Sequence, residues 1–121
     1  MSRILIVDDE PDVVEFLSDE LQLAGWQTGK ARDGVEAVLK VLDGKWDAML
    51  LDIRMPNLDG INALKIIRRI APDLPVVMFT GQAGKGDMYE SVRLGAYTCL
   101  LKPIDMDKLL DTLGACLPPT P

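Results

Sequence analysis

The stretch MLLDIRMPNLDG, residues 49–60, passes from a buried-strand pattern into a loop through one carboxylate. Met49, Leu50 and Leu51 are apolar, and Asp52 follows them directly. A carboxylate at the end of a buried strand is costly to desolvate unless another group pairs with it. Asp52 is therefore either a turn residue that reaches water or a residue held at this position for its chemistry.

This apolar run is one of five segments with a strand pattern. DAMLL (47–51), RILIV (3–7) and PVVMF (75–79) are compact and aliphatic, as strands buried on both faces of a parallel sheet are. WQTGKA (26–31) and YTCLL (97–101) are weaker and more mixed, which predicts strands at the edges of the sheet.

Helical patterns separate these strands. The segment 86–94 is the weakest of them, because Met88 and Val92 are its main apolar residues. Each of the other four segments has apolar residues at helical spacing, which predicts one buried face per helix. These faces are Val13, Val14, Leu17, Leu21 and Ala24; Val35, Val38, Leu39 and Leu42; Ile61, Leu64, Ile67 and Ile70; and Leu109, Leu110, Leu113 and Leu117.

Start signals precede the four stronger helices, and glycines stand where three helices should end. Five strand–helix units in sequence predict an α/β fold, a single doubly wound five-stranded parallel sheet with five helices on its two faces, of the flavodoxin-like class. The start signals are Pro11, Asp33 with Glu36 at capping-box spacing, Asp59 and Asp105, and the glycines are Gly25, Gly44 and Gly95.

Length, charge and cysteine content narrow the class of protein. The 121 residues suit one domain, which we expect over residues 1–117, and the Pro-rich tail 118–121 reads as the start of a linker or as a chain end. Because the net charge is −6, we do not expect this domain to bind nucleic acid. No apolar run reaches membrane-spanning length. Two cysteines and the absence of a signal-peptide pattern favour the reducing cytoplasm, and the absence of histidine excludes histidine chemistry.

Polar residues follow four of the five strands. In a parallel sheet the carboxyl ends of the strands share one edge, where ligand sites of this architecture lie. Clustered carboxylates repel one another without a cation, and a site rich in hard oxygens suits Mg²⁺. The residues at this edge are Asp8, Asp9 and Glu10 after the first strand, Asp52 after the third, Thr80 after the fourth and Lys102 after the fifth.

Four motifs, ILIVDDE, LLDIRMPNLDG, VVMFTG and GAYTCLLKP, resemble those of the response-regulator receiver domain in order and separation. The resemblance covers residues 2 to 117 and implies the strand order 2-1-3-4-5. It also implies a place in a two-component phosphorelay, in which a histidine kinase or a histidine phosphotransfer protein donates a phosphoryl group. Further implied partners are an output domain beyond residue 121 and a phosphorylation-dependent second copy of the chain.

The resemblance assigns Asp52 as the phosphoacceptor, which is nucleophilic chemistry by a carboxylate. Asp9 and Asp52 are expected to bind Mg²⁺, or Mn²⁺, directly and Asp8 through water, with the carbonyl of Arg54 as a further ligand. Lys102, in a Lys–Pro bond that the family holds in the cis form, is expected to neutralise charge on the transferring group.

The signal is expected to leave this site through Thr80, which hydrogen-bonds the attached phosphoryl group in the family. An aromatic residue of the last strand then moves inward behind that threonine, but Cys99 occupies its position here. We therefore predict that Cys99 leaves the aromatic switch out and that the loop 81–86 carries the change. Arg54 and Gln82 are expected to border the phosphoryl group, with Arg54 shielding it from water.

Two other functions remain open. An aspartate-nucleophile phosphohydrolase has a second Asp two residues after its nucleophile, whereas Ile53 and Arg54 follow Asp52 here. A degenerate receiver would serve as a phosphorylation-independent docking module. We expect that the protein is not an enzyme with turnover. It is instead expected to be a signalling domain that promotes its own phosphorylation and dephosphorylation. Simpler interpretations are helix capping by Asp8, Asp9 and Glu10, a turn role for Asp52, strand packing for Thr80 and an exposed charge at Lys102.

Overall fold

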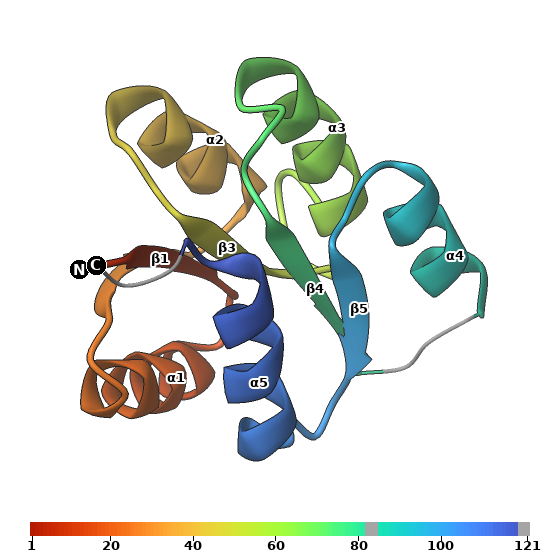
Figure 1. The fold of residues 1–121 in the computed structure, drawn as a ribbon. Helices are drawn as coiled ribbons and strands as arrows, with labels where there is room; N and C mark the ends of the chain where they lie inside the picture. Colours follow the sequence, from red (N-terminus) through yellow and green to blue (C-terminus); the bar gives the residue numbers. More distant parts are fainter. Residues whose placement is uncertain (82–84, 119–121) are drawn as a thin grey trace.

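Strands and helices alternate along the chain in the computed structural model, which describes residues 1–81 and 85–118 (Figure 1). The strands are β1 (Arg3–Val7), β2 (Gln27–Ala31), β3 (Ala48–Asp52), β4 (Val76–Thr80) and β5 (Thr98–Leu101). The helices are α1 (Pro11–Leu23), α2 (Gly34–Asp43), α3 (Gly60–Ile70), α4 (Lys85–Arg93) and α5 (Met106–Cys116). None of these helices is long and apolar enough to cross a membrane.

All strands are parallel and form one sheet in the order β2-β1-β3-β4-β5, which confirms the predicted order and the edge positions of β2 and β5. Helices α1 and α5 cover one face of the sheet, and α2, α3 and α4 cover the other (Figure 1). Each face buries its own apolar cluster, so the central strands are buried on both sides. This double burial explains their continuous aliphatic sequences.

Strands β3 and β4 end one residue later than the sequence pattern predicts. The ladder continues because Ile53 N donates to Phe79 O over 3.0 Å and Lys102 N donates to Thr80 O over 2.9 Å. Asp52 and Thr80 are therefore the last residues of buried strands rather than the first residues of loops. Because the sheet holds their backbones, the Cα positions of Asp52 and Thr80 are fixed.

The predicted buried face of α2 is wrong except at Val38, which packs against the core. Val35, Leu39 and Leu42 are 48%, 53% and 61% exposed, and the helix instead turns Ala37 toward the core. The first turn sets this rotation, because the backbone at Gly34 packs so closely on Leu58 that a Cβ at this position would overlap the Leu58 carbonyl.

The predicted faces of α1, α3 and α5 are largely confirmed. Their central apolar residues are buried, while Ala24 and Ile70, at the ends of the predicted faces of α1 and α3, are exposed. The buried residues include Val14, Leu17, Leu21, Leu64, Ile67, Leu109 and Leu113 on these helices and Leu117 at the C-cap of α5.

Three aspartates cap helices as their spacing predicts. The carboxylates of Asp33, Asp59 and Asp105 each accept a hydrogen bond from the backbone N–H three residues later, in α2, α3 and α5. At the other helix ends, Gly25 and Gly95 have φ angles of 97° and 102°, which glycine adopts without strain.

Gly60 offers a test of how tightly the loop after β3 is packed. Its N–H donates to Ile53 O over 2.7 Å, and a Cβ at this position would overlap the Asp52 carbonyl oxygen and lie 2.7 Å from the Ile53 Cα. We expect Gly60→Ala to lower the free energy of unfolding by about 1–3 kcal/mol, measured by urea denaturation.

Gly114, in the exposed part of α5, is the matched control for this change. A Cβ added at Gly114 would have no other atom within 4 Å, so Gly114→Ala should raise stability by up to about 1 kcal/mol through helix propensity. Equal effects of the two substitutions would contradict the close packing at Gly60.

Candidate functional site

The carboxyl ends of β1, β3 and β5 bring two acids and one base together at one edge of the sheet. The ammonium of Lys102 donates to Asp8 Oδ2 over 3.1 Å and lies 3.4 Å from Asp52 Oδ1. It also lies 4.0 Å from Glu10 Oε1. Asp8 and Asp52 are buried, so Lys102 is the cation on which two buried carboxylates from different strands depend.

Local hydrogen bonds hold Asp8 in place at the end of β1. Its N–H donates to Ala31 O over 3.2 Å, and its Oδ1 accepts from Glu10 N over 3.0 Å. The side chain therefore uses one oxygen to shape the turn into α1 and the other to bind Lys102. This contact is made to the N-cap residue Glu10 itself, and no side-chain hydrogen bond caps α1.

Asp8, Asp9 and Asp52 form a candidate metal site. Each offers a carboxylate oxygen, and these oxygens lie within 4.8 Å of one another. Asp9 is exposed while the other two are buried, so the cluster opens to water on one side. Mg²⁺ binds proteins through one or two carboxylates and keeps several waters, which fits this donor set.

Thr80 completes the site from β4. The residue is 1% exposed, and its Oγ1 is buried without a hydrogen-bond partner among the described residues. A buried hydroxyl that leaves its hydrogen bond unmade costs folding free energy. Thr80 ends β4, the strand that pairs with β3, whose last residue is Asp52.

Burial and neighbouring charges shift the pKa values of two residues at the site. Burial, with a further contribution from the charge of Asp8, raises the pKa of Asp52 from 3.8 to about 6, although Lys102 opposes the shift. Burial alone would lower the pKa of Lys102, but the charges and hydrogen bonds of Asp52 and Asp8 outweigh it and raise that pKa. The pocket thus holds more negative charge than one lysine offsets.

The other predicted residues lie around this centre. The Lys102–Pro103 bond is cis, as the resemblance implies. Arg54 directs its exposed side chain toward α4, where Nη2 lies 3.5 Å from Asp87 Oδ2. No motif singles out Asp87, and sequence reasoning missed it. Gln82 lies outside the described residues.

Cys99 is separated from the charged centre by its place on β5. It is 8% exposed, pairs in register with Met78 and packs in the cluster between the sheet and helices α2, α3 and α4. Thr80 pairs in register with Leu101, two residues further along β5. Cys99 therefore lies two positions before the register partner of Thr80 on β5.

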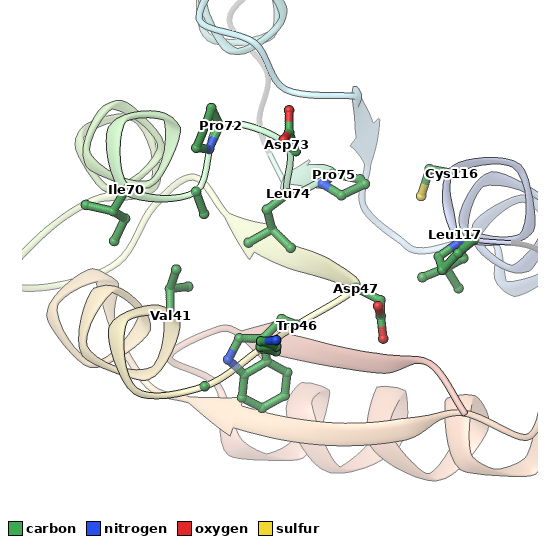
Figure 2. Close-up of a pocket in the computed structure, with 14 residues that line it drawn as sticks. Val41, Trp46, Asp47, Ile70, Pro72, Asp73, Leu74, Pro75, Cys116 and Leu117 are labelled. Atoms are coloured by element: carbon green, nitrogen blue, oxygen red, sulfur yellow. The ribbon is translucent and has the colours of Figure 1, made fainter.

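A groove of about 680 Å³ lies at the opposite edge of the sheet, where β3 and β4 begin (Figure 2). Figure 2 shows Trp46, Leu74 and Leu117 on its walls. The indole N–H of Trp46 donates to Lys40 O over 3.0 Å, and the Asp47 carboxylate accepts from the backbone of Arg3. These polar groups hold the fold together, and the groove contributes nothing to the acidic site.

Comparison with known proteins gives close matches over most of the chain. A family model described as the response regulator receiver domain matches residues 4–114. Regulatory protein AtoC of Escherichia coli is 41% identical over 109 residues, which are 90% of this chain and 24% of AtoC. The transcriptional regulatory protein CpxR homolog of Haemophilus influenzae is 38% identical over 117 residues, which are 97% of this chain and 51% of that protein.

The chain thus spans about a quarter to a half of the length of these two relatives. Among solved structures, the response regulator protein TrrA of Thermotoga maritima in complex with Mg²⁺-BeF superposes with a TM-score of 0.88 at 32% identity. The match covers 97% of this chain and all of the TrrA chain. Fold and sequence therefore agree on the same family.

The raised pKa of Asp52 makes a prediction about stability in metal-free buffer. Between pH 3.8 and about 6 the folded protein holds a proton at Asp52 that the unfolded chain releases, so stability falls as the pH rises. We expect Asp52→Asn to remove this dependence and to be more stable than the wild type at pH 7.5, by up to about 3 kcal/mol. Thermal unfolding in chelator measures the difference.

The advantage of Asp52→Asn should vanish near pH 4, where Asp52 of the folded wild type is itself protonated. Asp111→Asn, which removes an exposed acid from α5, is the control and should leave the pH profile unchanged. If Asp52→Asn showed the same pH profile as the wild type, the Asp52 carboxylate would not be the desolvated charge that lowers stability.

Proposed function

This chain belongs to the response regulator receiver domain family, and we propose that it acts as a phosphoacceptor whose modified residue is Asp52. The observation that carries this proposal is the pairing of a buried carboxylate at the end of β3 with Lys102, beside a hydroxyl without a partner among the described residues. In a two-component system the donor is a phosphohistidine of a histidine kinase or of a histidine phosphotransfer protein.

In the proposed transfer a carboxylate oxygen of Asp52 attacks the donor phosphorus. A new O–P bond forms while the P–N bond to the donor imidazole breaks, and that nitrogen keeps the electron pair. The Lys102 ammonium, already 3.4 Å from Asp52, offsets negative charge on the phosphoryl oxygens. The buried Thr80 hydroxyl donates to one of those oxygens once the group is attached.

We propose that Asp8, Asp9 and Asp52 hold Mg²⁺ or Mn²⁺, with the backbone carbonyl of Arg54 as a further ligand. The close approach of three carboxylate oxygens supports this assignment. A bound divalent ion supplies positive charge that offsets both these carboxylates and the incoming phosphoryl group.

We further propose that the domain promotes its own phosphorylation and dephosphorylation and is not a phosphohydrolase, because Ile53 and Arg54 follow Asp52 where the hydrolase pattern has its second acid. A phosphorylation-independent docking role is disfavoured by the assembled charges, which a docking module does not need. The proposed setting is the cytoplasm, and the proposed arrangement of the whole protein includes an output domain beyond residue 121 and a phosphorylation-dependent homodimer.

The proposed route of the signal avoids an aromatic switch. Tyr97, the aromatic residue nearest to Cys99 in the sequence, is 49% exposed, and its N–H donates to Val76 O at the start of β4. Tyr97 and Leu101, the register partner of Thr80, are four positions apart in the sequence, which is about 13 Å along a strand. Tyr97 is therefore too far from Thr80 to move in behind it.

We expect Tyr97 to stay on the surface when the site is occupied by a phosphoryl mimic. Crystal structures of the protein with and without beryllofluoride and Mg²⁺ measure its position. The expected change is a shift of the chain after Thr80 and of α4. An inward rotation of Tyr97 with α4 unmoved would contradict the proposed role of Cys99.

Phosphorylation itself is tested by intact-mass spectrometry after incubation with acetyl phosphate and Mg²⁺. We expect one added phosphoryl group on the wild type, none on Asp52→Asn and none on either protein in excess chelator. Asp111→Asn, on α5, is the control for removal of a carboxylate and should be modified like the wild type. Equal modification of Asp52→Asn would show that the acceptor is another residue.

A further inference from the structure

The side chain of Arg54 has two candidate partners, Asp87 on α4 and a phosphoryl group on Asp52. In the unmodified structure it pairs with Asp87. Arg54 follows Asp52 by two residues, yet its guanidinium lies 3.5 Å from Asp87 Oδ2, which is its ion-pair partner among the described residues. The cation at Asp52 is Lys102. Asp87 therefore draws Arg54 away from the carboxylate that is to be phosphorylated.

Of the two acids that line the cavity beside Arg54, Asp87 is the one that pairs with it. Arg54, Asp59 and Asp87 line a cavity of about 270 Å³ between the loop after β3 and the start of α4. Asp59 is occupied, since both its oxygens accept hydrogen bonds from Asn62 in the first turn of α3. The carboxylate of Asp87 has Arg54 as its ion-pair partner within the described part of the chain.

Asp87 is also well anchored. Its backbone carbonyl accepts a 2.7 Å hydrogen bond from the hydroxyl of Ser91, a residue with no exposed surface. The first turn of α4 is thus tied to the core, and the Asp87 carboxylate extends from a fixed base toward Arg54. In contrast, the Arg54 side chain is largely exposed and free to choose between partners.

Phosphorylation would add a strong competitor for this guanidinium. An attached phosphoryl group carries close to two negative charges and three acceptor oxygens. Arginine matches such a group with paired hydrogen bonds, which exceed a single 3.5 Å contact with a carboxylate. Because Arg54 is two residues from Asp52 and its side chain is largely exposed, the phosphoryl group would compete with Asp87 for its guanidinium.

We propose that Asp87 is a positioning residue that sets the lifetime of the aspartyl phosphate by competing with it for Arg54. When Arg54 contacts the phosphoryl group, it shields the acyl phosphate from water and the first turn of α4 loses its tie to the β3 loop. When Asp87 holds Arg54, the acyl phosphate is open to hydrolysis. This inference rests on the phosphorylation of Asp52 proposed above.

The test is a double-mutant cycle on phosphoryl lifetime. Wild type, Asp87→Asn, Arg54→Ala and the double variant are phosphorylated with acetyl phosphate and Mg²⁺, freed of donor and followed by intact mass. We expect Asp87→Asn to lengthen the half-life roughly two- to fivefold, the range that an exposed ion pair supports. Arg54→Ala should shorten the half-life, and adding Asp87→Asn to Arg54→Ala should change nothing further.

Three comparisons separate this role from a general effect on α4. Glu90→Gln removes an acid from the same helix that pairs with Arg93, and it should leave the half-life unchanged. Asp87→Glu keeps the charge and should restore most of the wild-type lifetime. The difference between wild type and Asp87→Asn should shrink in 1 M salt, which screens an exposed pair.

The outcomes distinguish this inference from the function on which it depends. A wild type that takes up no phosphoryl group overturns both. A phosphorylated wild type whose lifetime is unaffected by Asp87→Asn, or is lengthened equally with and without Arg54, overturns the role of Asp87 and leaves the phosphoacceptor assignment standing.

Discussion

One ammonium between two buried carboxylates makes this acidic pocket compatible with a folded chain. Lys102 Nζ lies 3.1 Å from Asp8 Oδ2 and 3.4 Å from Asp52 Oδ1, and the acids come from different strands. Without this cation, both carboxylates would be desolvated beside a like charge, which strongly raises the free energy of the charged forms. The pairing also joins β5 to the first and third strands across the intervening β4, so site and sheet are assembled together.

The compensation is incomplete, and the incompleteness is chemically useful. The pKa of Asp52 is raised to about 6 in spite of Lys102. The Thr80 hydroxyl is buried, and its hydrogen bond is unmade within the described part of the chain. An excess of negative charge and an unused donor are liabilities for stability but match a divalent cation and a phosphoryl group. The residues that weaken this part of the fold are those to which we assign its function.

We propose that the surface around the pocket transmits the phosphorylation of Asp52. In this proposal Cys99 places no aromatic ring behind Thr80, and Tyr97, which precedes β5, stays exposed. Arg54 and Asp87 instead connect the loop after β3 with α4. In the proposed exchange, the Arg54 guanidinium moves from Asp87 to the phosphoryl group. This movement requires little rearrangement of the core, which suits a sheet whose strands are packed on both faces.

Local residue patterns by themselves determined the five strand–helix units, the helix caps and the polar residues at the strand ends. These features depend on short-range chemistry, namely apolar periodicity, the carboxylates of Asp33, Asp59 and Asp105, and the shared edge of parallel strands. Tertiary structure alone decided the rotation of α2, which a close backbone contact at Gly34 imposes against its apolar stripe. It alone decided the ion pair of Arg54 with Asp87, the burial of the Thr80 hydroxyl and the raised pKa of Asp52. Each of these depends on which atoms from distant segments meet and how much water they exclude, and no local pattern encodes either.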